Sequence, residues 1–109
     1  FNEKAPCLDE ESSRYRAAAL DALHAADPDA TLLEINTGAM SRGWRTSPYP
    51  ARFLLEEWRN MGGQVILTAD AHSSDAIVYA YPEAAELARA AGYSHAILLT
   101  ASGWVPEPL

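Results

Sequence analysis

Apolar residues follow two different spacings along this chain, and the two spacings alternate. Helical spacing, with serine or proline near the start and glycine or proline at the end, predicts three helices. These helices cover residues 13–26, 50–61 and 82–91. Short continuous apolar runs, whose length suits strands, predict three strands. These strands cover residues 31–36, 65–68 and 95–100.

The predicted order, helix then strand three times over, is typical of an α/β fold. Because the strands are apolar throughout rather than alternating, we expect a parallel sheet covered on both faces. Residues 103–109 are expected to form a short tail or an edge strand. Three such units do not close a barrel, and an open sheet would leave apolar faces and edges uncovered. We therefore expect residues 1–109 to be one segment of a longer domain whose N-terminal part is missing. The exposed sheet edge would favour oligomerisation.

Composition narrows the classes of partner. The net charge of −7 argues against a nucleic-acid partner, which would need clustered lysine and arginine. No apolar run approaches the roughly 20 residues that span a bilayer, and no signal peptide is visible, so we expect no membrane partner. The single cysteine, Cys7, excludes an internal disulfide and fits a cytoplasmic location.

Asp70 and His72 follow directly after the second predicted strand. Residues two apart in an extended chain point to the same side, and active sites of parallel α/β folds gather at the carboxyl ends of strands. A carboxylate and an imidazole placed there suit zinc, iron or manganese. The alternative interpretation is that Asp70 caps the next turn and His72 is an ordinary surface residue.

Other polar residues are placed to join such a site. Glu34 and Asn36 end the first predicted strand and should face the same region, where they would support the metal ligands. A charge within an apolar strand is costly unless it is paired, so Glu34 either has such a role or pairs with a neighbouring arginine or lysine. Arg42 and Arg45 lie together in the polar loop that follows and suit phosphate recognition, the alternative being a solvated loop.

Several segments of this chain, in matching order and spacing, resemble the PHP (polymerase and histidinol phosphatase) metallophosphoesterases, in particular the histidinol-phosphatase branch. The matching segments are residues 1–4 (FNEK), 33–39 (LEINTGA), 41–50 (SRGWRTSPYP), 66–73 (ILTADAHS), 82–88 (PEAAELA) and 91–93 (AGY). The resemblance implies the C-terminal part, about three β/α units, of a distorted (β/α)7 TIM-like barrel that holds up to three divalent metals. Asp70 and His72 match the last metal ligands of the family. The N-terminal His-x-His pair and the other earlier ligands of the family have no counterpart in this sequence.

The function that the resemblance implies is metal-dependent hydrolysis of a small phosphate monoester. The expected substrate is L-histidinol phosphate, an intermediate of histidine biosynthesis, and the expected nucleophile is a metal-bound water rather than a side chain. Arg42 is the first candidate for phosphate contact and Arg45 the second. The isolated chain is expected to be inactive, because two ligands do not build the metal cluster. The alternatives are a related phosphoesterase acting on a nucleotide or sugar phosphate, and a non-catalytic α/β binding module.

Overall fold

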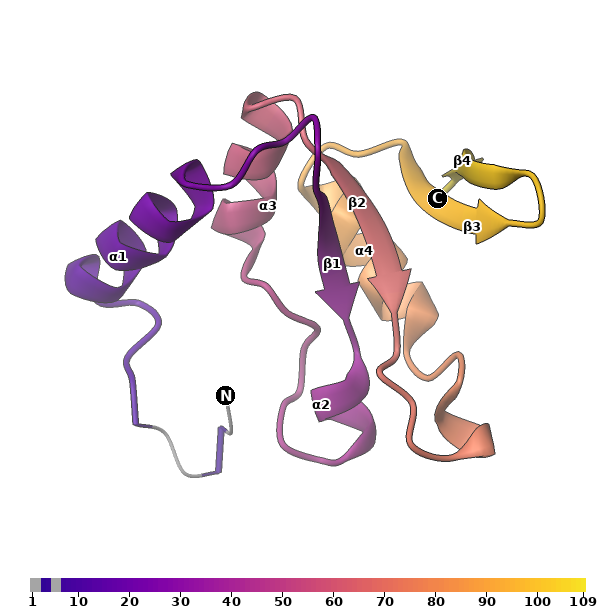
Figure 1. The fold of residues 1–109 in the computed structure, drawn as a ribbon. Coiled ribbons are helices and arrows are strands. Elements are labelled where there is room, and N and C mark those ends of the chain that lie inside the picture. Colours follow the sequence, from indigo (N-terminus) through magenta and orange to yellow (C-terminus); the bar gives the residue numbers. More distant parts are fainter. Residues whose placement is uncertain (1–2, 5–6) are drawn as a thin grey trace.

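Helices and strands alternate through most of the chain (Figure 1). The computed structural model describes residues 3–4 and 7–109. Phe1 and Asn2, part of one segment that resembles the PHP family, lie outside the described residues. The elements in order are α1 (Ser13–His24), β1 (Leu32–Asn36), α2 (Gly38–Ser41), α3 (Arg52–Asn60), β2 (Gln64–Thr68), the 3-10 turn η1 (Ser74–Ala76), α4 (Tyr81–Ala90), β3 (His95–Thr100) and β4 (Gly103–Pro108).

The sheet of β1 and β2 confirms the parallel pairing expected of the first two strands. Its register runs from Leu32 opposite Gln64 to Asn36 opposite Thr68. Both strands therefore end at the same edge of the molecule, where α2 and the loop that contains η1 also lie (Figure 1). Any side chains carried by these two loops are brought to one end of the sheet.

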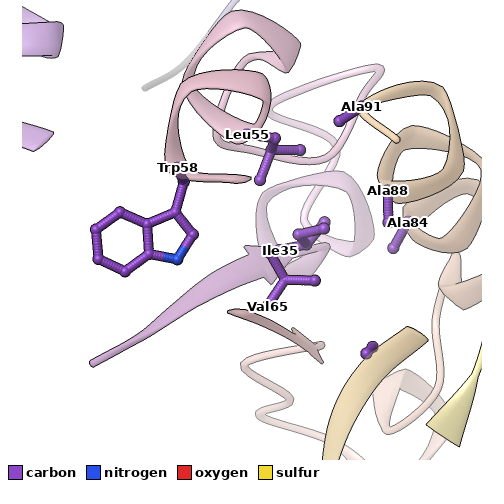
Figure 2. Close-up of a cluster of buried hydrophobic side chains, with 8 residues drawn as sticks. Ile35, Leu55, Trp58, Val65, Ala84, Ala88 and Ala91 are labelled. Carbon is purple, nitrogen blue, oxygen red and sulfur yellow. The ribbon is translucent and has the colours of Figure 1, made fainter. Parts of the chain in front are cut away.

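The core lies between this sheet and helices α3 and α4 (Figure 2). Trp58 of α3 is 1% exposed, and its indole Nε1 donates a hydrogen bond to the carbonyl oxygen of Gln64 (2.9 Å). Small residues on α4 let that helix approach the sheet closely. The buried cluster consists of Ile35, Leu55, Trp58, Val65, Ala84, Ala88, Ala91 and Ala96. Replacing a buried aromatic residue such as Trp58 with alanine typically costs about 3–5 kcal/mol.

Helix α1 is attached to the outside of α3 rather than to the sheet. Ser12 caps its first turn as predicted, since the Ser12 hydroxyl accepts a hydrogen bond from the backbone N–H of Tyr15 (3.2 Å). None of its residues is buried. The His24 ring lies 2.7 Å from the carboxylate of Glu57 on α3, and this contact lowers the pKa of Glu57.

The third strand departs from the prediction. We expected β3 to continue the parallel sheet, but β3 pairs antiparallel with β4, from His95 opposite Pro108 to Thr100 opposite Gly103. The tight turn between them explains the hairpin, because Gly103 has a φ of 104° that favours glycine and the Thr100 hydroxyl donates to the Gly103 carbonyl (2.9 Å). Residues 103–109 thus supply an edge strand, one of the two forms predicted for them.

The hairpin also leaves apolar side chains in solvent. Trp104 is 58% exposed, and Leu98 and Leu99 are exposed beside it. The described residues therefore form a mixed α/β structure with two small sheets. Within the part of the chain that the structure describes, no helix combines the length and apolar character needed to cross a bilayer.

Candidate functional site

The candidate site lies where β1 and β2 end. The backbone N–H of Thr37 donates to the carbonyl oxygen of Thr68 (3.0 Å), which ties the two strand ends together. Asn36 is buried, and its side-chain oxygen accepts a hydrogen bond from the backbone N–H of Gly38 (2.8 Å). Asn36 therefore holds the start of α2 against the strand ends, which is a structural contact next to the predicted ligands.

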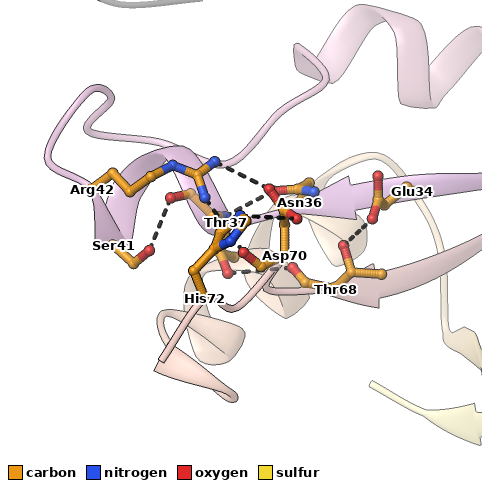
Figure 3. Close-up of polar contacts among 9 residues, drawn as sticks. Glu34, Asn36, Thr37, Ser41, Arg42, Thr68, Asp70 and His72 are labelled. Carbon is orange, nitrogen blue, oxygen red and sulfur yellow. Dashed lines mark hydrogen bonds and ion pairs between the residues drawn. The ribbon is translucent and has the colours of Figure 1, made fainter. Parts of the chain in front are cut away.

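Three predicted site residues meet at this edge: Arg42, Asp70 and His72 (Figure 3). Asp70 Oδ1 lies 3.6 Å from His72 Nε2, and Asp70 Oδ2 lies 3.2 Å from Arg42 Nη2. The side chains of Asp70 and His72 are 48% and 75% exposed, whereas that of Arg42 is 26% exposed. Arg42 is thus the more deeply placed member, and the two candidate ligands face solvent.

The backbone brings Asp70 and His72 together in a way that the sequence did not suggest. We expected two residues of an extended chain to point to the same side. Instead, Asp70 has a φ of 44°, in the left-handed region that non-glycine residues rarely occupy. Such a conformation costs on the order of 1 kcal/mol and is often found at functional sites.

Gly38 is the reason that α2 can approach Asp70 so closely. A Cβ atom at this position would lie 2.7 Å from the carbonyl oxygen of Ala69 and 2.9 Å from the Cβ of Asp70. It would also lie 3.1 Å from Arg42 Nη2. The absence of a side chain at Gly38 therefore makes room for the Arg42–Asp70 pair.

Glu34 has a partner that the sequence analysis did not consider. Its carboxylate accepts a short hydrogen bond from the hydroxyl of Thr68 on the neighbouring strand, rather than pairing with an arginine or lysine. Burial raises the pKa of Tyr81, and the negative charge of Glu34 raises it further. Glu34 is exposed and lies two residues before Asn36 on β1, so it borders the site, and none of its hydrogen bonds among the described residues reaches Asp70.

Arg45 makes a different set of contacts. Its side chain is 5% exposed, and its Nη1 donates to Glu10 Oε1 (2.9 Å). Burial alone would lower the pKa of Arg45, but the hydrogen bond and charge of Glu10, aided by Glu3, raise it above its ordinary value. The structure thus joins Arg42 to the candidate ligands and gives Arg45 a carboxylate partner. The contact of Arg45 with phosphate stays a prediction.

A small hollow of about 170 Å³ opens beside the Arg42–His72 side of the site. Its lining includes Ser73, Asp75 and Tyr79, which the sequence analysis did not single out. A hydrogen bond from Ser73 lowers the pKa of Asp75. The only sequence signal for these residues was their position within seven residues of His72.

A second, larger hollow, of about 630 Å³, lies elsewhere. It borders the amino ends of β1 and β2, at Leu32 and Gln64, and is also lined by Ile97 and Trp104 of the hairpin. Asp29 is its only ionisable lining residue. It lies at the opposite end of the strands from Asp70, so the candidate site is the smaller hollow.

The pair Asp70 and His72 fits a divalent metal ion as two of its ligands. Zinc binds carboxylate oxygen and imidazole nitrogen at about 2.0–2.2 Å, so two neighbouring ligand atoms of one ion lie about 3–4 Å apart. The 3.6 Å between Asp70 Oδ1 and His72 Nε2 lies in that range. No third histidine, cysteine, aspartate or glutamate joins them among residues 3–4 and 7–109.

No protein-family model matches the sequence, and no curated protein matches it.

Proposed function

We propose that this chain contributes part of a divalent metal site that hydrolyses a small phosphate monoester, and that L-histidinol phosphate is the substrate. The observation that carries the proposal is the convergence of Asp70, His72 and Arg42 at the carboxyl ends of two parallel strands. Parallel α/β enzymes place their active sites at that edge. The resemblance of residues 66–73 to the PHP motif supports the same assignment.

Each of the three residues has a distinct task in this proposal. Asp70 and His72 would be metal ligands, and the bound metal would supply activation of water and polarisation of the phosphoryl oxygens. Arg42 uses the guanidinium N–H groups that Asp70 leaves free to bind phosphate oxygens, where its positive charge offsets the charge that develops on them. The small hollow between Arg42, His72 and Asp75 receives the substrate.

The barrel is proposed together with the function. Two parallel strands, covered by α3 and α4 on one face, are compatible with neighbouring β/α units of a TIM-like barrel. In this proposal the remaining strands and metal ligands lie in a preceding part of a longer protein.

Metal binding by the chain itself tests the ligand assignment. Mn²⁺ is titrated into ¹⁵N-labelled protein, and paramagnetic broadening of backbone signals reports where the ion sits even when affinity is low. We expect broadening centred on Asp70 and His72, and its loss in Asp70→Asn and in His72→Gln. His95→Gln is the matched control, because His95 is an exposed histidine on β3, away from the site.

Activity provides the second test. The 109-residue chain alone should show no appreciable phosphatase activity, whereas a longer protein that contains it should hydrolyse histidinol phosphate when manganese, zinc or iron is supplied. In the Mn²⁺ titration, broadening that is unchanged in both Asp70→Asn and His72→Gln would refute the ligand assignment. Hydrolysis of a nucleotide or sugar phosphate but not of histidinol phosphate would keep the site and change the substrate.

The ion pair between Arg42 and Asp70 favours one other function. An arginine that pairs with the carboxylate of Asp70 can hold α2 against the loop after β2, as in a non-catalytic binding module. That function predicts no localised Mn²⁺ broadening, together with a loss of stability in Asp70→Asn.

A further inference from the structure

The small hollow beside the candidate site is lined by two side chains of opposite charge. Arg42 borders it from the end of α2, and Asp75 borders it from the turn η1. These two are the only arginine, lysine, aspartate or glutamate residues in the part of its lining that the structure describes. Because α2 and η1 lie at the same end of the β1–β2 sheet (Figure 1), two segments far apart in the sequence bring a cation and an anion to one cavity.

Asp75 is held on an ordered turn, and its carboxylate has no cationic partner in the protein. Ala76, which is 8% exposed, anchors the turn, and its backbone N–H donates to the carbonyl oxygen of Ser73 (3.1 Å). A hydrogen bond from Ser73 lowers the pKa of Asp75, so the carboxylate is charged at neutral pH. Asp70 pairs with Arg42, whereas no lysine or arginine among residues 3–4 and 7–109 forms an ion pair with Asp75.

Arg42 keeps donors for an anion although Asp70 contacts it. Its Nη1 donates to the backbone carbonyl oxygen of Asp70 (3.4 Å), and its Nη2 donates to the carboxylate (3.2 Å; Figure 3). Each of these two nitrogen atoms carries a further N–H that can donate to a phosphate oxygen. The hollow can therefore bind an anionic group and a cationic group of one small molecule at the same time.

We propose that Asp75 is a specificity-determining residue that selects zwitterionic phosphate monoesters, by pairing with a cationic amino group of the substrate while Arg42 binds the phosphate. This inference rests on the proposed function and deepens it. L-histidinol phosphate carries an ammonium group on the carbon next to the phosphorylated one, whereas nucleotide phosphates and simple sugar phosphates carry no such group. Tyr79 borders the same hollow, and the face of its ring attracts cations.

The alternative task of Asp75 is purely local. A carboxylate that accepts a hydrogen bond from Ser73 also stabilises the turn, whatever the hollow binds. Asparagine keeps a side-chain oxygen that can accept this hydrogen bond and removes only the charge. Asp75→Asn therefore separates selection of a cation from support of the turn.

The test compares two esters of equal length in the 109-residue protein. O-Phosphoethanolamine is the part of histidinol phosphate that carries both charges, and ethyl phosphate lacks the amino group. Each is titrated into ¹⁵N-labelled protein at low salt with EDTA present, and the shifts of the Ser41, Arg42 and Tyr79 backbone signals give the two dissociation constants. The variants are Asp75→Asn and, as the matched control, Asp21→Asn, which removes the same charge from the exposed surface of α1.

We expect the wild-type protein to bind O-phosphoethanolamine about two- to fivefold more tightly than ethyl phosphate, since exposed ion pairs are weak. Asp75→Asn should bind both esters alike, and Asp21→Asn should keep the wild-type ratio. The ratio should also approach one in the wild-type protein at about 1 M salt, where charges are screened within about 3 Å. This measurement serves if Asp75→Asn does not fold, which thermal unfolding checks.

A wild-type ratio of one at low salt, a ratio that Asp75→Asn leaves unchanged, or a ratio that 1 M salt leaves unchanged would overturn the selection by Asp75. Each of these results leaves the phosphate contact of Arg42 intact, provided that Arg42→Met weakens binding of ethyl phosphate. Ethyl phosphate that binds equally well to Arg42→Met and to the wild type would instead overturn the phosphate contact in the proposed function. Signals that shift with neither ester would overturn the hollow as the substrate site, and the selection with it.

Discussion

Substitution of Gly38 by alanine tests whether close packing of α2 controls the candidate site. The added Cβ would lie 2.7 Å from the carbonyl oxygen of Ala69 and 2.9 Å from the Cβ of Asp70, so one of these atoms must move. Overpacking of this kind typically costs about 1–3 kcal/mol. Alanine in a helix recovers about 0.5–1 kcal/mol relative to glycine. We therefore expect a net loss of about 0.5–2 kcal/mol in the free energy of unfolding.

The same substitution should also weaken metal binding, because the Cβ pushes against Asp70 and against Arg42 Nη2. Urea unfolding followed by tryptophan fluorescence measures the stability, and Mn²⁺ broadening measures the site. We expect the Mn²⁺ dissociation constant to rise by about tenfold, as for loss of a partner that orients a ligand.

Gly62→Ala separates the two effects. Gly62 has a φ of 89°, so alanine is strained there by about 1–2 kcal/mol, yet nothing lies within 4 Å of the new Cβ. This control should lose similar stability and keep its Mn²⁺ affinity. The reasoning fails if Gly38→Ala is as stable as the wild type, or if both variants bind Mn²⁺ equally well.

Two further predictions concern stability. Arg45→Met should lower the free energy of unfolding by about 2–4 kcal/mol, because it leaves the largely buried carboxylate of Glu10 without its partner; a loss below about 1 kcal/mol in urea unfolding would contradict this. Burial raises the pKa of Tyr93 to about 12, so the unfolded tyrosine ionises at lower pH than the folded one, and stability should fall as the pH rises from about 10 to about 12. Tyr93→Phe, which also removes the hydrogen bond to the Gly63 carbonyl, should flatten that dependence in thermal unfolding measured across this range.

Several features of the site depend on contacts between residues that lie far apart in the sequence. Arg42 and Asp70 are 28 residues apart, and Arg45 and Glu10 are 35 residues apart. Both arginines occur in the same polar loop, and both were candidates for phosphate contact, Arg42 the first and Arg45 the second. When α2 packs against the loop after β2, one of the two arginines contacts a candidate ligand, whereas the other contacts Glu10.

What the sequence by itself determined was the local part of the fold. Helical spacing and capping residues placed α1, α3 and α4 to within a few residues, and the apolar runs placed β1, β2 and β3, because these signals act within one or two turns of the chain. It also placed Asp70 and His72 directly after a buried strand. The parallel pairing of β1 and β2 was expected from the same continuous apolar runs.

Only the tertiary structure decided which strand β3 joins and how the site is held. An apolar run suits a parallel sheet and a hairpin equally well. The choice depends on the turn at Gly103 and on where α4, the preceding helix, ends. The left-handed backbone of Asp70 and the missing side chain at Gly38 matter for the site only when the two strand ends lie side by side. These features arise from contacts between distant segments, and periodicity along the chain carries no information about them.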